Sequence, residues 1–199
     1  MNVAILFLLA SGSAQDLVTQ GNAAMAAKRS QEAVALYEGA VALRPNSAEA
    51  HYNLGRAYYR LGDFSRALDG FERAARLQRK GRLAAMARYN AGHCLFQQGL
   101  GLVYGEPQTA LGLLEQSLAS LQESVRLDVV LRSDAMHNAD VVKKWLQLIQ
   151  QQIAQHRTTG AGAPGSGPGP AIDAILGQDK GVRSAGGAKV RPMTAGKDW

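Results

Sequence analysis

A spacing of 34 residues is the feature that most restricts how this chain can fold. Three short segments share one pattern around a glycine: LVTQGNAAM (17–25), HYNLGRAYY (51–59) and RYNAGHCLF (88–96). Their glycines, Gly21, Gly55 and Gly92, follow one another at intervals of 34 and 37 residues. A period of this length indicates that one small supersecondary unit recurs and that neighbouring units stack to bury a common core.

The first two copies agree at further positions. Counted from Ala14 and Ala48, the eighth residue is glycine, the twentieth and twenty-seventh are alanine, and the twenty-fourth is aromatic. The pairs at these positions are Gly21 and Gly55, Ala33 and Ala67, Ala40 and Ala74, and Tyr37 and Phe71. Small residues let two helices approach closely, and large ones fill the space that remains between them. The spacing therefore predicts a helix-turn-helix unit.

The pattern resembles the tetratricopeptide repeat (TPR), a 34-residue helical hairpin with these residue types at these positions. The resemblance implies an all-α fold, a TPR solenoid of about three repeats followed by a C-terminal capping helix. The repeats fall at about 14–47, 48–81 and 85–131. Aligning SLQESVRL with GFERAARL gives the third repeat thirteen inserted residues. This insertion predicts either a longer second helix or a loop that bulges before it.

A further helix of the first type is expected at 133–156, with Ser133 as its N-cap. Asn138 aligns with Asn53 of the second repeat, but Asp140 stands where the repeat has glycine. No partner helix follows in the sequence. A capping helix that closes the apolar stack explains both features.

The two ends of the chain differ in composition from the TPR domain predicted at 15–156. Residues 1–14 contain an apolar run followed by small residues, which is typical of a signal peptide cleaved after Ala14. The alternative is an apolar extension that packs on the first helix. The run is too short to cross a bilayer, and no later segment is apolar enough to do so. The chain is therefore predicted to be exported to the periplasm or cell envelope, with no transmembrane segment in its mature form.

Residues 157–199 are rich in Gly, Pro and Ala and predict a disordered, flexible tail. Within it, residues 170–177 carry Ile172, Ile175 and Leu176 at helical spacing, and the chain ends at Trp199. This apolar motif and the terminal tryptophan are interpreted as a short linear binding motif. The alternative is a solubilising tail with incidental apolar residues.

In TPR proteins, partners lie in a concave groove formed by the first helices, at fixed repeat positions. The resemblance places nine residues in that groove: Asn22, Tyr52, Asn53, Arg56, Tyr59, Tyr89, Asn90, His93 and Phe96. Aromatic rings beside amides and a guanidinium suit an extended peptide, because the rings bury apolar area while the amides bind its backbone. The alternative for Tyr59 and Phe96 is packing between helices.

Some TPR co-chaperones of the large heat-shock proteins clamp a terminal carboxylate with lysine, arginine and asparagine side chains. Asn22 and Asn53 match that pattern, but Val18, Tyr89 and His93 occupy its three cationic positions. Losing three charges removes the electrostatic core of the clamp. A cytoplasmic, co-chaperone-like peptide binder is therefore the second hypothesis, and it requires an uncleaved N-terminus.

No arrangement of residues in the sequence indicates catalysis, a metal site or a cofactor. The four histidines do not align in the repeats, and the single cysteine, Cys94, points about 100° away from its neighbour His93 around a helix. GLGLVYG (99–105) lacks both the spacing of a phosphate-binding loop and a preceding strand. The expected function is therefore non-enzymatic.

The combination of the TPR body, the segment HNADVVKKWLQLIQQQ, a Gly/Pro spacer, AIDAILGQDKG and a final KDW resembles the exported TPR proteins of the aerotolerance (Bat) operons. Those proteins are encoded beside membrane proteins with von Willebrand factor type A (VWA) domains and a MoxR-type ATPase. The resemblance implies an adaptor in the cell envelope that binds proteins or peptides, with a VWA-domain membrane protein as a partner.

A third hypothesis is that the protein binds nucleic acid. The leading hypothesis, a protein-binding adaptor, expects no nucleic-acid partner. It rests on the formal net charge of +6 and on one basic group in the sequence. That group comprises Arg73, Arg76, Arg79, Lys80, Arg82 and Arg88.

Overall fold

The computed structural model describes residues 13–158. All regular secondary structure in this part of the chain is α-helical. The helices are α2 (Ala14–Ala26), α3 (Ser30–Leu43), α4 (Ala48–Arg60), α5 (Phe64–Leu77), α6 (Arg82–Leu102), α7 (Pro107–Leu127) and α8 (Arg132–Thr158). No strand occurs within 13–158, so the all-α prediction is confirmed. Nearly all of the predicted signal peptide, and the tail motif with Ile172, Ile175, Leu176 and Trp199, lie outside the described residues.

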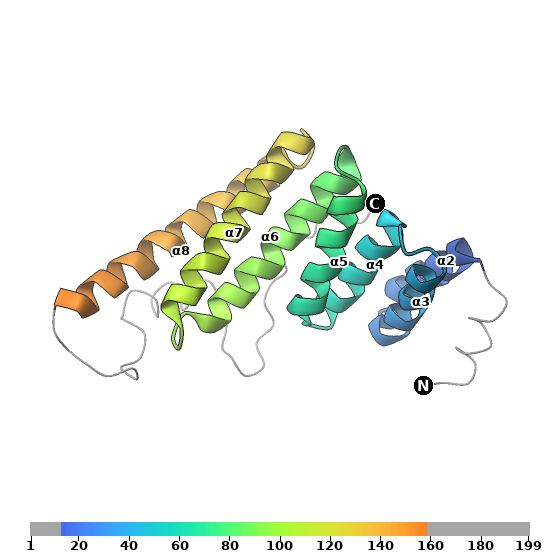
Figure 1. Cartoon of the computed structure of the whole chain (residues 1–199), viewed down its shortest axis with the longest axis horizontal. Helices are drawn as coiled ribbons and strands as arrows, with labels where there is room; N and C mark the ends of the chain where they lie inside the picture. Colours follow the sequence, from blue (N-terminus) through green and yellow to red (C-terminus); the bar gives the residue numbers. More distant parts are fainter. Residues whose placement is uncertain (1–12, 159–199) are drawn as a thin grey trace.

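The helices follow one another along the long axis of the molecule, each packed beside its neighbours in the chain (Figure 1). Successive helices form three hairpins, α2 with α3, α4 with α5 and α6 with α7, and α8 packs on α7 at the end of the stack. The first helices of neighbouring hairpins also touch, α2 with α4 and α4 with α6. This is the stacked solenoid that the 34-residue period predicts.

The repeated glycines lie where paired helices cross, as the sequence pattern predicts. A Cβ atom built on each would lie 2.5 Å from Tyr37 Cε1 at Gly21, 2.9 Å from Phe71 Cδ1 at Gly55, and 2.9 Å from Leu121 Cγ at Gly92. The large residue in each contact comes from the second helix of the same hairpin. A side chain at any of the three glycines would therefore push its hairpin apart.

The third hairpin settles the two alternatives for its inserted residues. Both α6 and α7 are 21 residues long, compared with 13 or 14 for the helices of the first two hairpins. Only residues 103–106 connect them. The insertion therefore lengthens both helices, and no loop bulges from the hairpin.

The start of α8 differs slightly from the prediction. The helix begins at Arg132, and the backbone N–H of Ala135 already donates to the carbonyl of Leu131 at 2.9 Å. Ser133 therefore lies in the first turn, and the prediction that it is the N-cap was wrong. Asp134 also lies in this first turn, where its negative carboxylate interacts favourably with the positive end of the helix dipole.

At the other end of the stack, Ser13 and Asp16 form a capping box on α2. The backbone N–H of Asp16 donates to Ser13 Oγ at 3.2 Å, and the backbone N–H of Ser13 donates to Asp16 Oδ2 at 2.9 Å. Hydrogen bonds from Ser13 lower the pKa of Asp16. Cleavage after Ala14 remains a prediction, and it would remove this cap.

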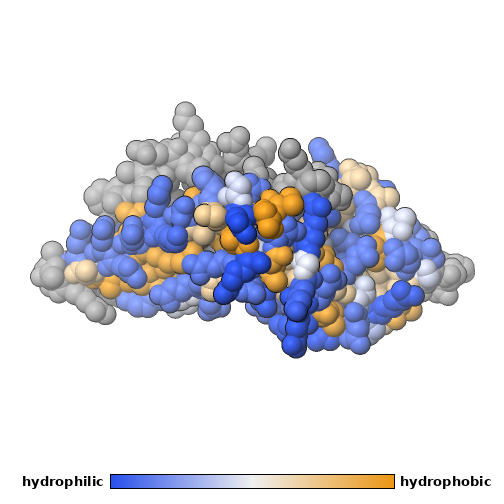
Figure 2. Space-filling view, turned by 90° about the horizontal axis from the view of Figure 1, so that it is seen from above, coloured by the Kyte–Doolittle hydropathy of each residue, from blue (hydrophilic) through white to orange (hydrophobic). Residues whose placement is uncertain are grey.

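Hydrophilic residues cover most of the face seen from above, and apolar residues form strips between them (Figure 2). No helix of the described part has both the length and the apolar character that crossing a bilayer requires.

Two buried serines on α7 lead to a prediction of opposite effects on stability. Ser117 Oγ donates to the carbonyl of Gly92 at 2.7 Å, whereas Ser124 Oγ has no hydrogen-bond partner within 13–158. We expect Ser124→Ala to raise the free energy of unfolding by about 1 kcal/mol, because the alanine removes an unsatisfied polar group. We expect Ser117→Ala to lower it by a similar amount, about 1 kcal/mol. Urea unfolding of the full chain measures both, and equal changes in the two variants would contradict the assignment.

Candidate functional site

The nine residues predicted to line the groove lie on α2, α4 and α6, and we call the side of these helices that carries them the first-helix face. The structure divides the nine into two groups. Exposed or half-buried residues are Asn22, Tyr52, Arg56, Tyr59 and Asn90. Buried residues are Asn53, Tyr89, His93 and Phe96. Only the first group presents side chains to a partner in this conformation.

Three residues of the accessible group meet between α4 and α6, and we call them the Tyr52 cluster: Tyr52, Arg56 and Asn90. Asn90 Nδ2 donates to the Tyr52 hydroxyl at 3.0 Å, across the junction between the second and third hairpins. The guanidinium carbon of Arg56 lies 6.0 Å from the centre of the Tyr52 ring. Burial raises the pKa of Tyr52, while the charge of Arg56 and the hydrogen bond from Asn90 oppose that rise. The cluster thus combines an aromatic ring, an amide and a cation within reach of solvent.

The Tyr52 ring packs against α5, the second helix of its own hairpin. It packs against Phe71 with 5.5 Å between ring centres and an interplanar angle of 56°. One turn beyond Arg56, Tyr59 packs edge-on against Phe64 at 5.3 Å, and burial raises the pKa of Tyr59 to about 12. These contacts fix Tyr52 and Tyr59 before any partner binds, which lowers the entropy lost on binding.

Asn22 lies on the first-helix face further towards the start of the stack. Its side-chain carbonyl accepts a hydrogen bond from the Tyr37 hydroxyl at 2.7 Å. Tyr37 itself is buried, and burial raises its pKa to about 12. This hydrogen bond uses the side-chain carbonyl of Asn22, so the amide nitrogen is the group that can bind a ligand.

Two residues predicted for the groove, Tyr89 and His93, instead belong to a buried polar network with α8. Asn138 Nδ2 donates to the Tyr89 hydroxyl at 2.7 Å and lies 3.0 Å from His93 Nε2. The Tyr89 and His93 rings pack together with 4.4 Å between their centres. Burial lowers the pKa of His93 to about 3, so its imidazole is neutral at neutral pH. Because both side chains are buried, neither Tyr89 nor His93 can contact a partner directly in this structure.

Phe96 and Asn53 are buried as well. Phe96 belongs to the largest apolar core, which joins α6, α7 and α8 and includes Trp145 and Ile149. Phe96 therefore packs between helices and does not line the groove in this structure. Of the two asparagines that match the carboxylate clamp, Asn53 is buried and only Asn22 is exposed.

The described residues contain no cluster of three or more His, Cys, Asp or Glu side chains that would hold a metal ion. Cys94 is fully buried between hairpins, and burial raises the pKa of its thiol.

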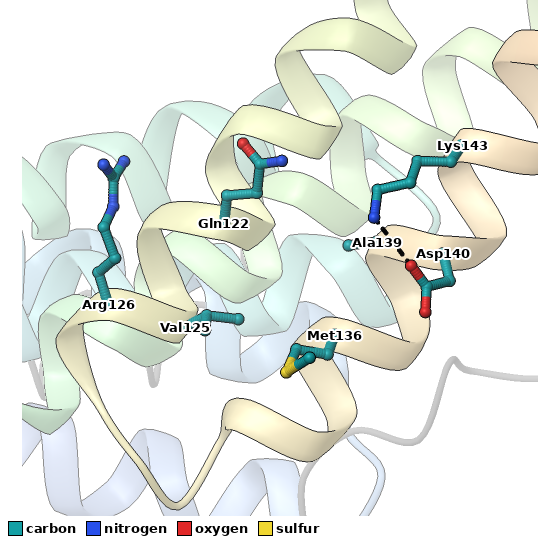
Figure 3. A pocket seen from close by; sticks show the side chains of 7 residues that line it. All are labelled: Gln122, Val125, Arg126, Met136, Ala139, Asp140 and Lys143. Carbon is teal, nitrogen blue, oxygen red and sulfur yellow. Dashed lines mark hydrogen bonds and ion pairs between the residues drawn. The ribbon is translucent and has the colours of Figure 1, made fainter.

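A separate groove of about 400 Å³ opens between the end of α7 and the start of α8 (Figure 3). Val125, Met136 and Ala139 provide its apolar lining. Its remaining lining residues are Gln122, Arg126, Asp140 and Lys143, and Lys143 Nζ lies 2.9 Å from Asp140 Oδ1. The repeat pattern of the sequence does not predict this α7–α8 groove.

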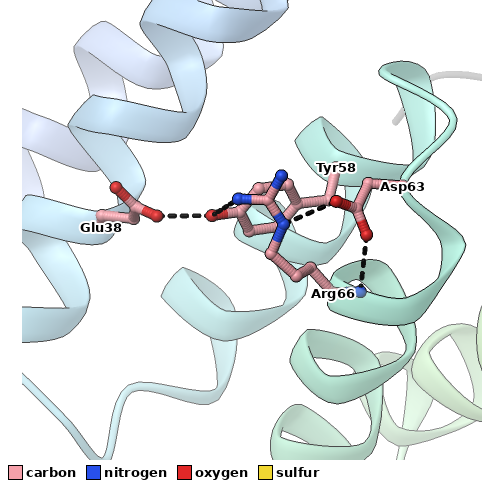
Figure 4. Close-up of polar contacts among 4 residues, drawn as sticks. All are labelled: Glu38, Tyr58, Asp63 and Arg66. Atoms are coloured by element: carbon pink, nitrogen blue, oxygen red, sulfur yellow. Dashed lines mark hydrogen bonds and ion pairs between the residues drawn. The ribbon is translucent and has the colours of Figure 1, made fainter.

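A polar network between the first two hairpins was also not predicted (Figure 4). The Tyr58 hydroxyl donates to Glu38 on α3 and accepts from Arg66 Nη1 on α5 at 3.3 Å. The Arg66 guanidinium lies over the Tyr58 ring at 4.3 Å, and its Nε donates to Asp63 at 2.6 Å. The network joins α3, α4 and α5 and so fixes the first hairpin relative to the second.

Comparison with known families agrees with the repeat pattern. Residues 21–62 match a family model described as TPR repeat, and residues 48–80 match one described as tetratricopeptide repeat. The chain contains tetratricopeptide repeats. These matches cover the first two TPR units, and no curated protein sequence matches the chain.

Solved structures show a similar TPR-like fold at low sequence identity. Two are of the type III secretion translocator chaperone SycD from Yersinia enterocolitica, each 14% identical with a TM-score of 0.50. One of them, in complex with a peptide of the translocator YopD, covers 69% of this chain and 92% of that chain, and the other covers 75% and 93%. The Sgt2 TPR domain from Aspergillus fumigatus is 21% identical with a TM-score of 0.46, covering 81% of this chain and 92% of that chain. The SycD matches concern the fold alone.

Proposed function

We propose that this chain is a non-enzymatic adaptor whose first-helix face binds an extended peptide segment of a protein partner. The observation that carries the proposal is the Tyr52 cluster. Its tyrosine is fixed by Phe71 and Asn90, and Arg56 supplies a cation beside the ring. An apolar side chain of the peptide would pack on Tyr52, and Asn90 or Asn22 would bind its backbone.

The chemistry of the accessible residues favours a peptide with an acidic group. Arg56 is the one cationic side chain among the five accessible predicted residues. A carboxylate near Arg56 would accept charge-assisted hydrogen bonds, which are stronger than those between neutral groups. That a stack of this kind can hold a peptide agrees with the SycD structure, which contains a peptide of the translocator YopD.

We also propose that the adaptor works in the cell envelope, with a VWA-domain membrane protein as its partner. Support comes from the apolar segment at residues 1–14 and from the resemblance of the cap and tail to the exported Bat TPR proteins. Affinity capture from an envelope fraction tests this setting. Recovery of a VWA-domain protein by the full chain is the expected result, and recovery of soluble cytoplasmic proteins alone would contradict it.

The role of the Tyr52 cluster is tested by the double variant Arg56→Ala/Asn90→Ala in the same capture experiment. Losing a charged and a neutral hydrogen-bonding group is expected to reduce recovery of the partner by about tenfold or more. Arg73→Ala is the control, because Arg73 is an exposed arginine on the second helix α5 and is not one of the residues of the first-helix face. Wild-type recovery by the double variant, with its helical circular dichroism intact, would exclude the cluster from the binding site.

A further inference from the structure

At the end of the helical stack, α8 differs from the earlier first helices in how it is paired. The first helices α2, α4 and α6 each pair with a second helix, whereas within 13–158 no second helix follows α8. The α7–α8 groove lies on the side of α8 that carries Asp140. Asp140 is at the repeat position of Gly55 and Gly92, the residues on which Phe71 and Leu121 of the second helices rest. The groove is therefore the place that a second helix of a fourth unit would take.

Asp140 restricts what this place can accept. At the equivalent glycines, a large side chain of the second helix fills the space that a Cβ would need. The carboxylate of Asp140 occupies that space and pairs with Lys143 at 2.9 Å. A regular second helix cannot approach α8 as closely as α5 approaches α4. A short segment that stays nearer the rim can bind without that close approach.

The groove has the character of a docking surface for such a segment. Met136 is 52% exposed although it is apolar, and Val125 and Ala139 lie beside it. Val129 and Val130, in the connection between α7 and α8, are also exposed apolar residues, although they do not line the groove. An exposed apolar surface rimmed by charged residues, as in this groove, is typical of an interaction site.

We propose that residues 170–177 of this same chain dock in the α7–α8 groove. The segment reads PAIDAILG, with Ile172, Ile175 and Leu176 at the spacing of one helical face. It lies outside the described residues, and its apolar side chains match the lining of the groove. Its one charged residue, Asp173, is complementary to Arg126 and Lys143 on the rim.

The rim cations remain accessible to Asp173. Lys143 pairs with Asp140 and Arg126 pairs with Glu123, but both pairs are exposed and join residues one turn apart. Exposed pairs of this kind are weak and rearrange readily. A carboxylate arriving at the rim can therefore share either cation.

The chain is long enough to bring the segment back to the groove. Ala139 lies 19 residues before the end of α8, a distance of about 28 Å at the helical rise of about 1.5 Å per residue. The 11 residues between Thr158 and Pro170 span up to about 40 Å when extended. A segment that returns in this way would run antiparallel to α8, as each second helix runs to its first helix.

Tethering favours the chain's own segment over a second copy of the protein. A short flexible linker holds a ligand at an effective concentration on the order of millimolar. A second copy reaches that concentration only in very concentrated solution. Weak apolar contacts are therefore sufficient within one chain and insufficient between chains at micromolar concentration.

Disulfide trapping in the full chain tests the proposal. Met136→Cys/Ile175→Cys places one thiol in the groove and one in the segment, and Cys94 does not compete because it is fully buried. The control is His137→Cys/Ile175→Cys, since His137 is exposed and lies about 100° around α8 from Met136. Under mild oxidation at micromolar protein concentration, we expect the Met136 pair to form an intramolecular disulfide at least about tenfold faster than the His137 pair.

A third variant adds Leu176→Asp to the Met136 pair and tests the apolar contact itself. We expect its rate of disulfide formation to fall to that of the His137 control. Equal rates for the two cysteine pairs, or no effect of Leu176→Asp, would overturn the proposal. Disulfide-linked dimers as the main product of the Met136 pair would also overturn it, because the occupant would then be a second copy.

Discussion

Replacing Gly70 with alanine is expected to lower the free energy of unfolding by about 2 kcal/mol, within the range measured for overpacked cores. A Cβ at Gly70 would lie 2.9 Å from Gly55 Cα, Gly55 N and the carbonyl oxygen of His51. All three contacts are with the backbone of α4, so no side chain can rotate away to make room. The helices α4 and α5 would have to separate and so weaken the core contacts of the second hairpin.

Gly112→Ala is the matched control, because Gly112 is also inside a helix but a Cβ there would meet nothing within 4 Å. Alanine is a better helix former than glycine, so this variant is expected to raise the free energy of unfolding by about 0.5–1 kcal/mol. Urea unfolding of both full-chain variants measures the two changes. A stabilising effect of Gly70→Ala would mean that α4 and α5 do not approach as closely as the structure has them.

Much of the fold could be predicted from sequence because its strongest constraints are local and periodic. Gly21, Gly55 and Gly92 recur at almost constant spacing because each lies under a large residue of the second helix in its own hairpin. A contact that recurs in every hairpin leaves a period in the sequence. Contacts that occur once leave no such period.

Gly70 shows where this kind of prediction ends. It contacts the backbone of Gly55 and His51, but the corresponding residue of the first hairpin is the buried Leu36. The close approach at Gly70 is therefore particular to the second hairpin and is not part of the repeat pattern. The polar network of Glu38, Tyr58 and Arg66 is particular to one junction in the same way.

The candidate site was predicted in part for the same reason. Repeat positions locate a face of a helix, and they place Tyr52, Arg56 and Asn90 together across α4 and α6. They do not say which part of that face a later helix covers. Asn138 is 49 residues from Tyr89 in sequence, and only the folded stack brings the two into contact. The alignment of Asn138 with Asn53 was the one available signal that α8 contributes to this side.

The covering of His93 by α8 has a consequence for pH. His93 Nε2 lies 3.0 Å from the side-chain nitrogen of Asn138, which already donates to Tyr89. The neutral imidazole can accept at Nε2, whereas the protonated ring would turn a second donor towards Asn138. Protonation in the folded state therefore faces both the loss of hydration and a missing acceptor.

We therefore expect the free energy of unfolding to fall as the pH is lowered through the window between about 6.5, the ordinary pKa of histidine, and the folded pKa of about 3. Within this window the unfolded chain binds a proton that the folded chain does not, so each unit of pH below 6.5 removes up to about 1.4 kcal/mol. Urea unfolding at pH 7 and pH 5 should differ by about 2 kcal/mol through this residue. His93→Gln keeps an acceptor without titrating, so this part of the difference should disappear, whereas the exposed control His137→Gln should retain it. An unchanged pH dependence in His93→Gln would show that the imidazole is not buried neutral beneath α8.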